Sequence, residues 1–265
     1  MSLRFFFCPC RRIFTPANFG ISMGTFQYNY PHALVHGQLV RRYKRFMADV
    51  RLDDGNVVVA HCTNSGSMKS CLEEGAEVWL SPVDNPARKT RFTWEMIRIG
   101  EGWVGINTSI PNVLAFEAMK QDAIPGLEGY GEIRREVKFR DSRFDIFAQG
   151  KQGSCFVEVK NVTLNEDGVA MFPDAVTTRG QKHLDTLVMV RESGIRAVLL
   201  FVIQRTDVDS FAPARHIDPV YAEKLTRAMD HGVEVIPWQV KVQAGSINPL
   251  GVLSMQTDQM NDTLH

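Results

Sequence analysis

The chain has few cysteines, and their spacing is not that of a paired set. Its five cysteines are an odd number, and no C-x-x-C pair occurs in the 265 residues. Disulfide-built domains and structural zinc sites use paired cysteines at characteristic spacings. The sequence therefore argues against both, and it fits a reducing cytoplasm, so we expect a cytoplasmic protein.

Long apolar runs and an excess of one charge are also missing. The longest apolar run, Ala197 to Ile203, is far shorter than the roughly 20 residues of a transmembrane helix, so no membrane segment is expected. The 30 basic residues balance the 30 acidic ones, which disfavours a uniformly basic DNA-coating protein but allows local basic patches. The apolar stretch near the N-terminus is too short for a secretory signal. We expect residues 1–33 to be a disordered leader, with Met23 as an alternative start.

What is present suits two modest domains, because 44% of the residues are hydrophobic and 23% are charged. Residues 34–110 contain short β-like runs separated by turn signals. Asp53-Asp54-Gly55 predicts one hairpin, and Gly100-Glu101-Gly102 predicts another. Short strands with few helices indicate a small barrel of the OB type.

Residues 111–245 change to a mixed pattern. Asn112 is a plausible N-cap for a helix over Val113–Ala123, and three β-like runs follow it. A second helix is expected over Thr178–Ser193, then a central strand, a helix opened by Asp218 and Pro219, and a last strand. We predict a mixed α/β fold, with an OB-like barrel followed by an α-β-β-β-α-β domain. Residues 246–265 are expected to be a loose tail.

Acidic and basic side chains meet on two of these runs. Side chains alternate along a strand, so Glu158 and Lys160 share one face of the run Ser154–Val162. A tight turn symmetric about Lys151 and Gln152 would place Asp145 directly opposite Glu158. Two facing carboxylates repel each other, and a bound Mg²⁺ or Mn²⁺ would relieve that repulsion. Lys160 could then orient an attacking water or steady a phosphoryl charge.

The alternative to this interpretation is an ordinary structural role for both acids. Asp145 and Glu158 could be neutralised by Lys160 and Arg143 on an ordinary salt-bridged sheet face. A third carboxylate could come from Glu117 on the preceding helix, although a charged residue at such a helix position more commonly faces solvent. Glu136 is a weaker rival, because it stands among charged residues of a strand edge.

Basic and aromatic residues alternate in two places in the first half. Phosphate attraction combined with base stacking requires both residue types, although a solvated strand could show the same pattern. The two segments are Arg41–Phe46 and Arg88–Trp94, and the basic residues in them that we expect to hold a nucleic-acid strand are Arg41, Arg42, Lys44, Arg45 and Arg91.

Several stretches together resemble a known family. Asp145 with Glu158-Val159-Lys160 is similar to the acid and lysine pattern of the PD-(D/E)xK nuclease superfamily. Between about residues 34 and 243 the chain resembles, more closely, the sugar fermentation stimulation protein A family of bacteria and archaea. The stretches that carry this resemblance are RRYKRFMADV (41–50), HCTNSGSM (61–68), DNPARKTRFTWE (84–95), VGINTSIPN (104–112), REVKF (135–139), FVEVKNVTL (156–164), FPDAVTTRGQKHL (172–184) and FAPARHIDPVYA (211–222).

The resemblance implies an N-terminal OB-like domain, a nuclease-like C-terminal domain, DNA binding and a role in regulating sugar (maltose) metabolism. It assigns the two acids and the lysine of the superfamily to Asp145, Glu158 and Lys160, and the helix acid to Glu117. Gln181 and Lys182 fall where related nucleases carry polar residues. Phe144 stands where the literal motif has proline.

Our hypothesis from the sequence is a DNA-binding protein with a Mg²⁺- or Mn²⁺-dependent phosphodiesterase site. Asp145 and Glu158 would hold the metal with help from Glu117, and Lys160 would help to generate the nucleophile. The barrel would hold DNA, and RNA is not excluded; the sequence indicates no oligomeric state. The alternative is a non-catalytic DNA-binding regulator that uses the nuclease domain as a silent scaffold.

Overall fold

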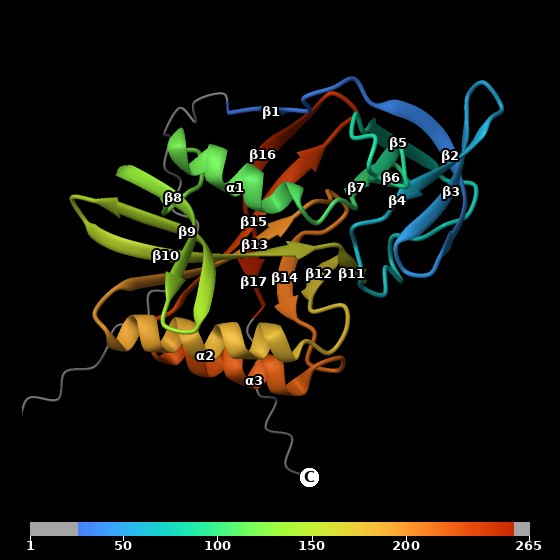
Figure 1. Ribbon diagram of the computed structural model, residues 1–265. Coiled ribbons are helices and arrows are strands. Elements are labelled where there is room, and N and C mark those ends of the chain that lie inside the picture. Colours follow the sequence, from blue (N-terminus) through green and yellow to red (C-terminus); the bar gives the residue numbers. More distant parts are fainter. Residues whose placement is uncertain (1–25, 257–265) are drawn as a thin grey trace, which may run out of the picture.

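A computed structural model describes residues 26–256 of the chain and consists of a small barrel beside a larger mixed sheet covered by helices (Figure 1). The barrel sheet has the order β4-β3-β2-β5-β6-β7, and β4 also pairs with β6, so that five strands close on themselves. This arrangement confirms the predicted OB-type barrel. Its strands are β2 (Val35–Tyr43), β3 (Met47–Leu52), β4 (Val57–His61), β5 (Glu77–Pro82), β6 (Phe92–Ile99) and β7 (Gly102–Gly105).

Two turns set the register at this end of the chain. The predicted turn at Asp53-Asp54-Gly55 is present between β3 and β4, with Gly55 at a φ of 87° that glycine adopts without a steric penalty. A further turn separates β2 from β3, and both Lys44 (φ 49°) and Arg45 (φ 64°) have positive φ there. Two successive residues of this kind make a tight hairpin turn whose twist matches the strands. Lys44 and Arg45 therefore lie at a hairpin tip.

The larger domain is built on a seven-stranded sheet of order β1-β16-β15-β13-β10-β9-β8. In Figure 1, α1 (Ile110–Lys120) lies on one face of this sheet, and α2 (Thr178–Glu192) and α3 (Pro219–Asp230) lie on the other. The mixed α/β prediction is thus confirmed. The sheet strands are β1 (Tyr28–Asn29), β8 (Tyr130–Phe139), β9 (Ser142–Gly150), β10 (Gly153–Val162), β13 (Arg196–Ile203), β15 (Glu234–Val242) and β16 (Ser246–Val252). A second, four-stranded sheet contains β11 (Leu164–Glu166), β12 (Val169–Phe172), β14 (Ser210–Pro213) and β17 (Ser254–Met255).

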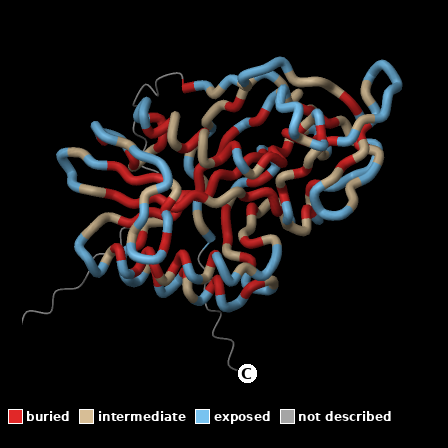
Figure 2. The backbone as a smooth tube through the Cα atoms, viewed as in Figure 1, coloured by how far each residue is buried: buried red, intermediate tan, exposed pale blue. Residues whose placement is uncertain are grey.

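The central strands bury both faces, as Figure 2 shows by their colour. Val157 and Val159 of β10 pack into the hydrophobic core beneath α1, whereas Phe156 and Val162 pack into the core beneath α2 and α3. This is the alternation expected of a strand covered on both sides. It directs Glu158 and Lys160 toward the α2 face.

Helix α1 begins three residues earlier than the sequence predicts. Its N-cap is Ser109, with no side-chain capping bond, and Pro111 occupies the first turn, where a missing N–H costs nothing. The expectation that Asn112 caps this helix is therefore wrong, and Asn112 lies inside it. The caps of the later helices are the side chains of Thr177, which accepts from Gly180, and of Asp218, which accepts from Tyr221 as predicted.

One segment of the predicted leader and one of the predicted tail belong to the main sheet. Tyr28 and Asn29, assigned to the leader, pair with Ile247 and Ser246 of the predicted loose tail, so the former make the edge strand of the main sheet and the latter belong to the strand beside it. Ile247 is completely buried, which gives this segment the apolar anchor that fixes it. The expectation of disorder is wrong for these segments; residues 1–25 and 257–265 lie outside the described range.

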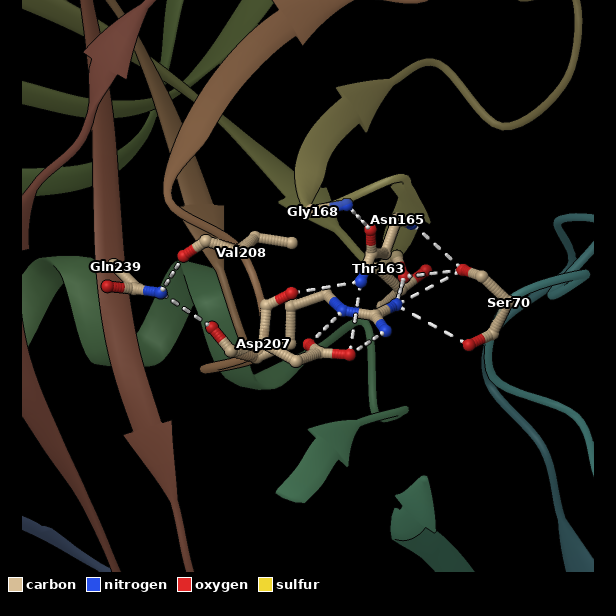
Figure 3. Close-up of polar contacts among 8 residues, drawn as sticks. Ser70, Thr163, Asn165, Gly168, Asp207, Val208 and Gln239 are labelled. Atoms are coloured by element: carbon tan, nitrogen blue, oxygen red, sulfur yellow. Dashed lines mark hydrogen bonds and ion pairs between the residues drawn. The ribbon is translucent and has the colours of Figure 1, made fainter. Parts of the chain in front are cut away.

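A buried arginine, Arg205, joins the barrel to the larger domain, and its partners Ser70, Thr163 and Asp207 are labelled in Figure 3. Arg205 is 1% exposed and donates to the Ser70 hydroxyl at 3.1 Å and to the carbonyl oxygen of Thr163. Its guanidinium also pairs with Asp207 at 2.7 Å. Ser70 belongs to the barrel part of the chain, and the other two residues belong to the larger domain. Charge-assisted bonds in a buried place hold the two parts together more firmly than surface contacts would.

None of the helices between residues 26 and 256 combines the length and the apolar character that crossing a membrane requires.

Candidate active site

The β9–β10 hairpin has the register that the sequence predicts. Gly150 pairs with Gly153, and the ladder continues to Ile146 opposite Val157. The next pair would be Asp145 and Glu158, but the ladder ends before it. Instead, the Val159 amide donates to the Asp145 carboxylate at 2.8 Å. The two acids are neighbours as expected, and they lie where the two strands separate.

Asp145 is poorly placed to carry a charge. Its Oδ1 accepts from the Asn112 amide at 2.6 Å, and its Oδ2 accepts from Val159. Burial and the negative charge of Glu158 raise the pKa of Asp145 to about 6, although the Val159 N–H and Lys160 act in the opposite direction. A cation beside this carboxylate would remove the main electrostatic conflict.

Glu158 is buried and has one occupied and one free oxygen. Its Oε1 accepts from Lys160 Nζ at 2.6 Å and contacts His183 Nδ1, whereas its Oε2 is buried without a hydrogen-bond partner among residues 26–256. Burial opposes ionisation, but Lys160 and His183 outweigh it and hold the pKa of Glu158 below its ordinary value. Glu158 is therefore ionised with an unsatisfied oxygen. A buried lone carboxylate oxygen costs free energy unless a donor or a cation joins it.

His183 is a site residue that the sequence pattern did not single out. It is 9% exposed and lies within 3.2 Å of Lys160 Nζ, on the face of α2 that packs against the sheet. A lysine-histidine pair on a helix, such as Lys182-His183, is more often a surface feature than part of a site. The signal that could have identified it is helical spacing, because His183, Leu187 and Val190 follow one another at four and three residues and are all buried.

Asn112 is the second missed residue, and it replaces the expected Glu117 at Asp145. Five residues of helix correspond to a rotation of about 140° beyond one full turn, so Glu117 points elsewhere. The Glu117 carboxylate pairs with Lys120 at 3.2 Å and is 38% exposed. Among residues 26–256 no three His, Cys, Asp or Glu side chains gather closely enough to hold a metal ion together. The structure therefore does not bring Glu117 to Asp145 and Glu158.

Glu136, the weaker rival of Glu117, has an electrostatic effect on Asp145. It lies on β8 between Arg135, which pairs with Ile146, and Val137, which pairs with Phe144. The negative charge of Glu136 contributes to raising the pKa of Asp145. Its carboxylate is 53% exposed and lies 3.9 Å from Arg143. Arg143 thus neutralises Glu136 rather than the Asp145–Glu158 pair.

The two central carboxylates fit a hard divalent cation. Mg²⁺ is commonly held by one or two carboxylates, with water and substrate phosphate completing its shell. Asp145 and Glu158 supply that number, and the free Glu158 Oε2 is an oxygen ligand in need of a partner. The donor set contains no thiolate, which also suits Mg²⁺, Mn²⁺ or Ca²⁺ better than zinc.

The basic residues expected to bind nucleic acid have different roles in the structure. Arg42 donates to the carbonyl oxygens of Asn64 and Gly66, so it holds a loop and is only partly accessible. Arg45, at the hairpin tip, donates to Ser65 but remains exposed. Arg41 pairs with Asp49 at 2.8 Å and lies over the Tyr43 ring. Lys44 and Arg91 are also exposed.

The two residues that the family resemblance indicated on α2 are not at the carboxylates. Gln181 donates to both oxygens of Asp218, at 3.0 and 3.1 Å, and thereby ties α2 to the start of α3. Lys182 is exposed on the outer face of α2. Within the described residues, His183 is the α2 side chain that reaches Glu158.

The chain matches two family models that together cover most of it. Residues 40–106 match the family described as the SfsA N-terminal OB domain, and residues 109–246 match the sugar fermentation stimulation protein RE domain. A sugar fermentation stimulation protein homolog from Geobacter sulfurreducens is 51% identical over 213 residues, which are 80% of this chain and 91% of that protein. A homolog of the same description from Shewanella loihica is 50% identical over 210 residues, 78% of this chain and 90% of that protein.

A solved structure is also similar. It is described as Pyrococcus furiosus SfsA in complex with Ca²⁺, and it superposes with a TM-score of 0.79 at 28% sequence identity. The match covers 86% of this chain and 98% of that one.

Proposed function

This chain belongs to the sugar fermentation stimulation protein family, and from that membership and the geometry above we propose that it is a divalent-metal-dependent nuclease. Asp145 and Glu158 would hold the cation, with Asn112 and the Val159 amide orienting Asp145. Lys160 would act on the phosphate or on the attacking water. The substrate would be nucleic acid held across the barrel, with DNA as the expected polymer.

One observation carries the proposal. Glu158 is 2% exposed and ionised, yet its Oε2 has no partner among residues 26–256, and it lies beside a second carboxylate that it destabilises. A salt-bridged sheet face would satisfy both oxygens, because that is how buried charges are tolerated. An unsatisfied carboxylate oxygen next to a second acid favours a cation site over that alternative.

The Ca²⁺ bound by a similar protein supports the same class of ion. The solved structure of Pyrococcus furiosus SfsA is a complex with Ca²⁺. Ca²⁺ takes oxygen ligands, as Mg²⁺ does, but with longer bonds and looser geometry. We therefore propose Mg²⁺ or Mn²⁺ as the working ion, and Ca²⁺ as an ion that binds without supporting cleavage.

The cation, Lys160 and His183 would have different roles in cleavage. A bound Mg²⁺ would supply Lewis-acid polarisation of a phosphoryl oxygen. Lys160 is held by Glu158 at 2.6 Å and lies 3.2 Å from His183 Nδ1, so its ammonium has a fixed position. An ammonium has three protons to donate, so at least one remains for a water or for a phosphoryl oxygen that gains charge. His183 is a positioning residue, because it contacts Lys160 and Glu158 from helix α2.

Cleavage assays test the proposal directly. Wild-type protein is incubated with single-stranded, duplex and branched DNA and with RNA, in Mg²⁺, Mn²⁺, Ca²⁺ or a chelator. We expect cleavage in Mg²⁺ or Mn²⁺ and none with chelator. Glu158→Gln, which keeps the shape but removes the charge, is expected to lose at least about a hundredfold in rate. The matched control is Glu132→Gln, since Glu132 is 57% exposed on β8 of the same sheet.

The rival function is decided by the same assays. If no substrate is cut in any metal while DNA binding persists equally in wild type and Glu158→Gln, the nuclease proposal is wrong. The protein would then be a DNA-binding regulator, in line with the sugar metabolism role that the family name suggests.

The barrel is proposed as the surface that holds the strand. Phe46 is 47% exposed at the β2–β3 hairpin and stacks on His61, with ring centroids 6.4 Å apart. Arg45 precedes Phe46 in the chain, and the Arg41 guanidinium lies over the ring of Tyr43. Exposed rings beside guanidinium groups are the chemistry of single-strand binding, in which bases stack and phosphates are attracted. Arg42 is excluded from this surface because it holds the Asn64–Gly66 loop.

We expect Phe46→Ala to weaken binding of single-stranded DNA about tenfold, the size of one lost stacking contact. Fluorescence anisotropy with a labelled single strand in Ca²⁺ measures it. Leu250→Ala is the matched control, because Leu250 is also 47% exposed but lies on β16 of the larger domain. Equal affinities of Phe46→Ala and wild type would place the strand elsewhere.

A further inference from the structure

A cleft lies between the barrel and the larger domain and has no role in the site described so far. Its volume of about 380 Å³ falls in the range of pockets that bind small organic groups. One side comes from the barrel loop Thr63–Gly66 and from Arg45; the other side comes from the end of β10 and from residues 171–177, which lead into α2. The two domains thus form it together.

The cleft adjoins the carboxylate site through three elements. Asn161 lines it and directly follows Lys160 on β10. Thr108 lines it just before α1, which carries Asn112, and Thr177 lines it as the N-cap of α2, which carries His183. A strand rises about 3.3 Å per residue, so Asn161 lies roughly 10 Å along β10 from Glu158. A nucleic-acid strand at the carboxylates would therefore bring a neighbouring nucleotide to the cleft.

The chemistry of its walls suits a nucleobase better than a phosphate. Leu164, Met171, Phe172 and Pro173 form an apolar wall, while the barrel loop offers hydroxyl, amide and backbone groups. A flat aromatic ring needs this combination of an apolar surface for its face and polar groups for its edge. In the described part of the chain, Asp174 is the one acid in the lining, and it would repel a phosphate. Arg45 is the one cation there, and its guanidinium donates to the Ser65 carbonyl oxygen of the barrel loop.

Asp174 is free to receive hydrogen bonds from a ligand. The Asp174 carboxylate packs directly against Gly66: a Cβ atom added to Gly66 would lie 2.0 Å from Asp174 Oδ2. The carboxylate therefore lies at the barrel loop, inside the cleft. The Asp174 carboxylate forms no hydrogen bond or ion pair with any of residues 26–256 that the structure records. Guanine presents two adjacent N–H donors on its pairing edge and so can bind both oxygens of a carboxylate, whereas thymine presents a single N–H there, flanked by two carbonyl oxygens that a carboxylate repels.

Hydrogen bonds hold both walls of the cleft in place before any ligand binds. Arg42 donates to the Asn64 and Gly66 carbonyl oxygens at 2.9 and 3.2 Å and thereby holds the barrel loop. Arg205 donates both to the carbonyl oxygen of Thr163 on the opposite wall and to the Ser70 hydroxyl, and these two partners are labelled in Figure 3. A pocket that is already formed does not lose affinity to ordering on binding.

We propose that this cleft binds one unstacked nucleobase, with guanine preferred through Asp174, next to the phosphate that would meet the cation of Asp145 and Glu158. The substrate class is then a single strand, or the single-stranded branch of a larger nucleic acid, because a paired and stacked base cannot enter. This inference rests on the proposed nuclease function for the identity of the polymer.

Binding in Ca²⁺ separates this inference from the cleavage proposal, since no turnover is needed. The probes are a single strand of alternating guanine and thymine, the same strand annealed to its complement, and a thymine-only strand. Wild type should bind the guanine-containing single strand most tightly. Asp174→Asn should lower that affinity about tenfold, as expected when a hydrogen bond to a charged group is lost, and leave thymine-only binding unchanged. Asp209→Asn is the matched control, because Asp209 is exposed and lies outside the cleft.

Photo-crosslinking gives a second readout that does not depend on the variant. A thymine strand carrying a single 6-thioguanine should crosslink to the peptides that contain residues 61–66 or 171–177. Crosslinks confined to the hairpin around Phe46, equal affinity of Asp174→Asn and wild type for guanine, or tighter binding of the duplex would each overturn the proposal. Preferred binding of guanine without cleavage would support the nucleobase cleft and contradict the nuclease function. Cleavage without a preference for guanine would support the nuclease function and contradict the nucleobase cleft.

Discussion

Asp145→Asn is expected to stabilise the metal-free protein while removing its metal response and its cleavage activity. The wild-type carboxylate is held ionised at neutral pH against burial and against Glu158, which raise its pKa to about 6. Asparagine removes that charge. Its Oδ1 can still accept from the Val159 amide, and its amide can donate to Asn112 after that side chain turns its own oxygen inward. We expect a gain of about 1–3 kcal/mol in the free energy of unfolding at pH 7.

The stability difference between Asp145→Asn and wild type should depend on pH, because only the wild-type carboxyl group titrates. An acid whose pKa is raised by folding destabilises the native state most strongly above its folded pKa, here about 6. As the pH falls from 6 toward the ordinary value of 3.8, the folded protein takes up the proton first and the penalty disappears. The advantage of Asp145→Asn over wild type should therefore be full at pH 7 and above and vanish by about pH 4.

Thermal unfolding with and without Mg²⁺ or Ca²⁺ checks the metal part. Wild type should unfold at a higher temperature in saturating metal, because a ligand that binds only the native state stabilises it. Asp145→Asn should show little or no such rise and should lose at least about a hundredfold in cleavage rate. A variant that is less stable than wild type at pH 7, or that keeps the full metal response, would contradict the assignment of Asp145 to a cation. Asp141→Asn is a suitable control, since Asp141 is exposed in the turn before β9.

Replacing Arg205 by methionine is expected to cost about 3 kcal/mol of stability. Arg205 is 1% exposed, and its removal leaves the carbonyl oxygens of Ser70 and Thr163 without their charged donor. Asp207 is 41% exposed, so water can take over its side of the ion pair, which keeps the loss below the largest values for buried pairs. Methionine fills much of the volume, so the loss reports mainly on the polar contacts.

Urea unfolding measures this loss, and Arg98→Met is the control. Arg98 pairs with Glu77 at 2.9 Å, but the two side chains are 45% and 39% exposed, and such surface pairs contribute roughly 1 kcal/mol or less. Because Arg205 joins the barrel to the larger domain, limited proteolysis of Arg205→Met should also cut between the two parts faster than in wild type. Equal losses in the two variants would mean that the buried arginine does not hold the domains together.

The hairpin that carries the acids was predictable because its determinants are local. Gly150 and Gly153 bracket a short turn, and the alternation along β10 decides which face Glu158 and Lys160 share. The barrel followed in the same way from short runs and turn signals. Each of these features depends on residues a few positions apart, so the sequence contains the required information.

The partners of those acids were not predictable from local pattern. Asn112 was interpreted as a cap, and the three-residue shift of α1 brought it to Asp145 instead of Glu117. His183 reaches Glu158 across 25 positions of sequence, and Arg42 holds the loop at Asn64. The chain end at Ser246–Val252 is ordered by the main sheet, which it pairs with at two strands. These contacts form only when distant segments meet.

The sequence by itself determined that two opposed acids and a lysine lie on neighbouring strands after an OB-type barrel, because strand alternation and turn geometry act over short distances. Only the tertiary structure decided that Glu158 keeps a free buried oxygen, that His183 rather than Lys182 stands beside it, and that a cleft with Asp174 lies between the domains. Burial and charge environment depend on which segments pack together, and that packing sets the pKa of Asp145 and the demand for a cation.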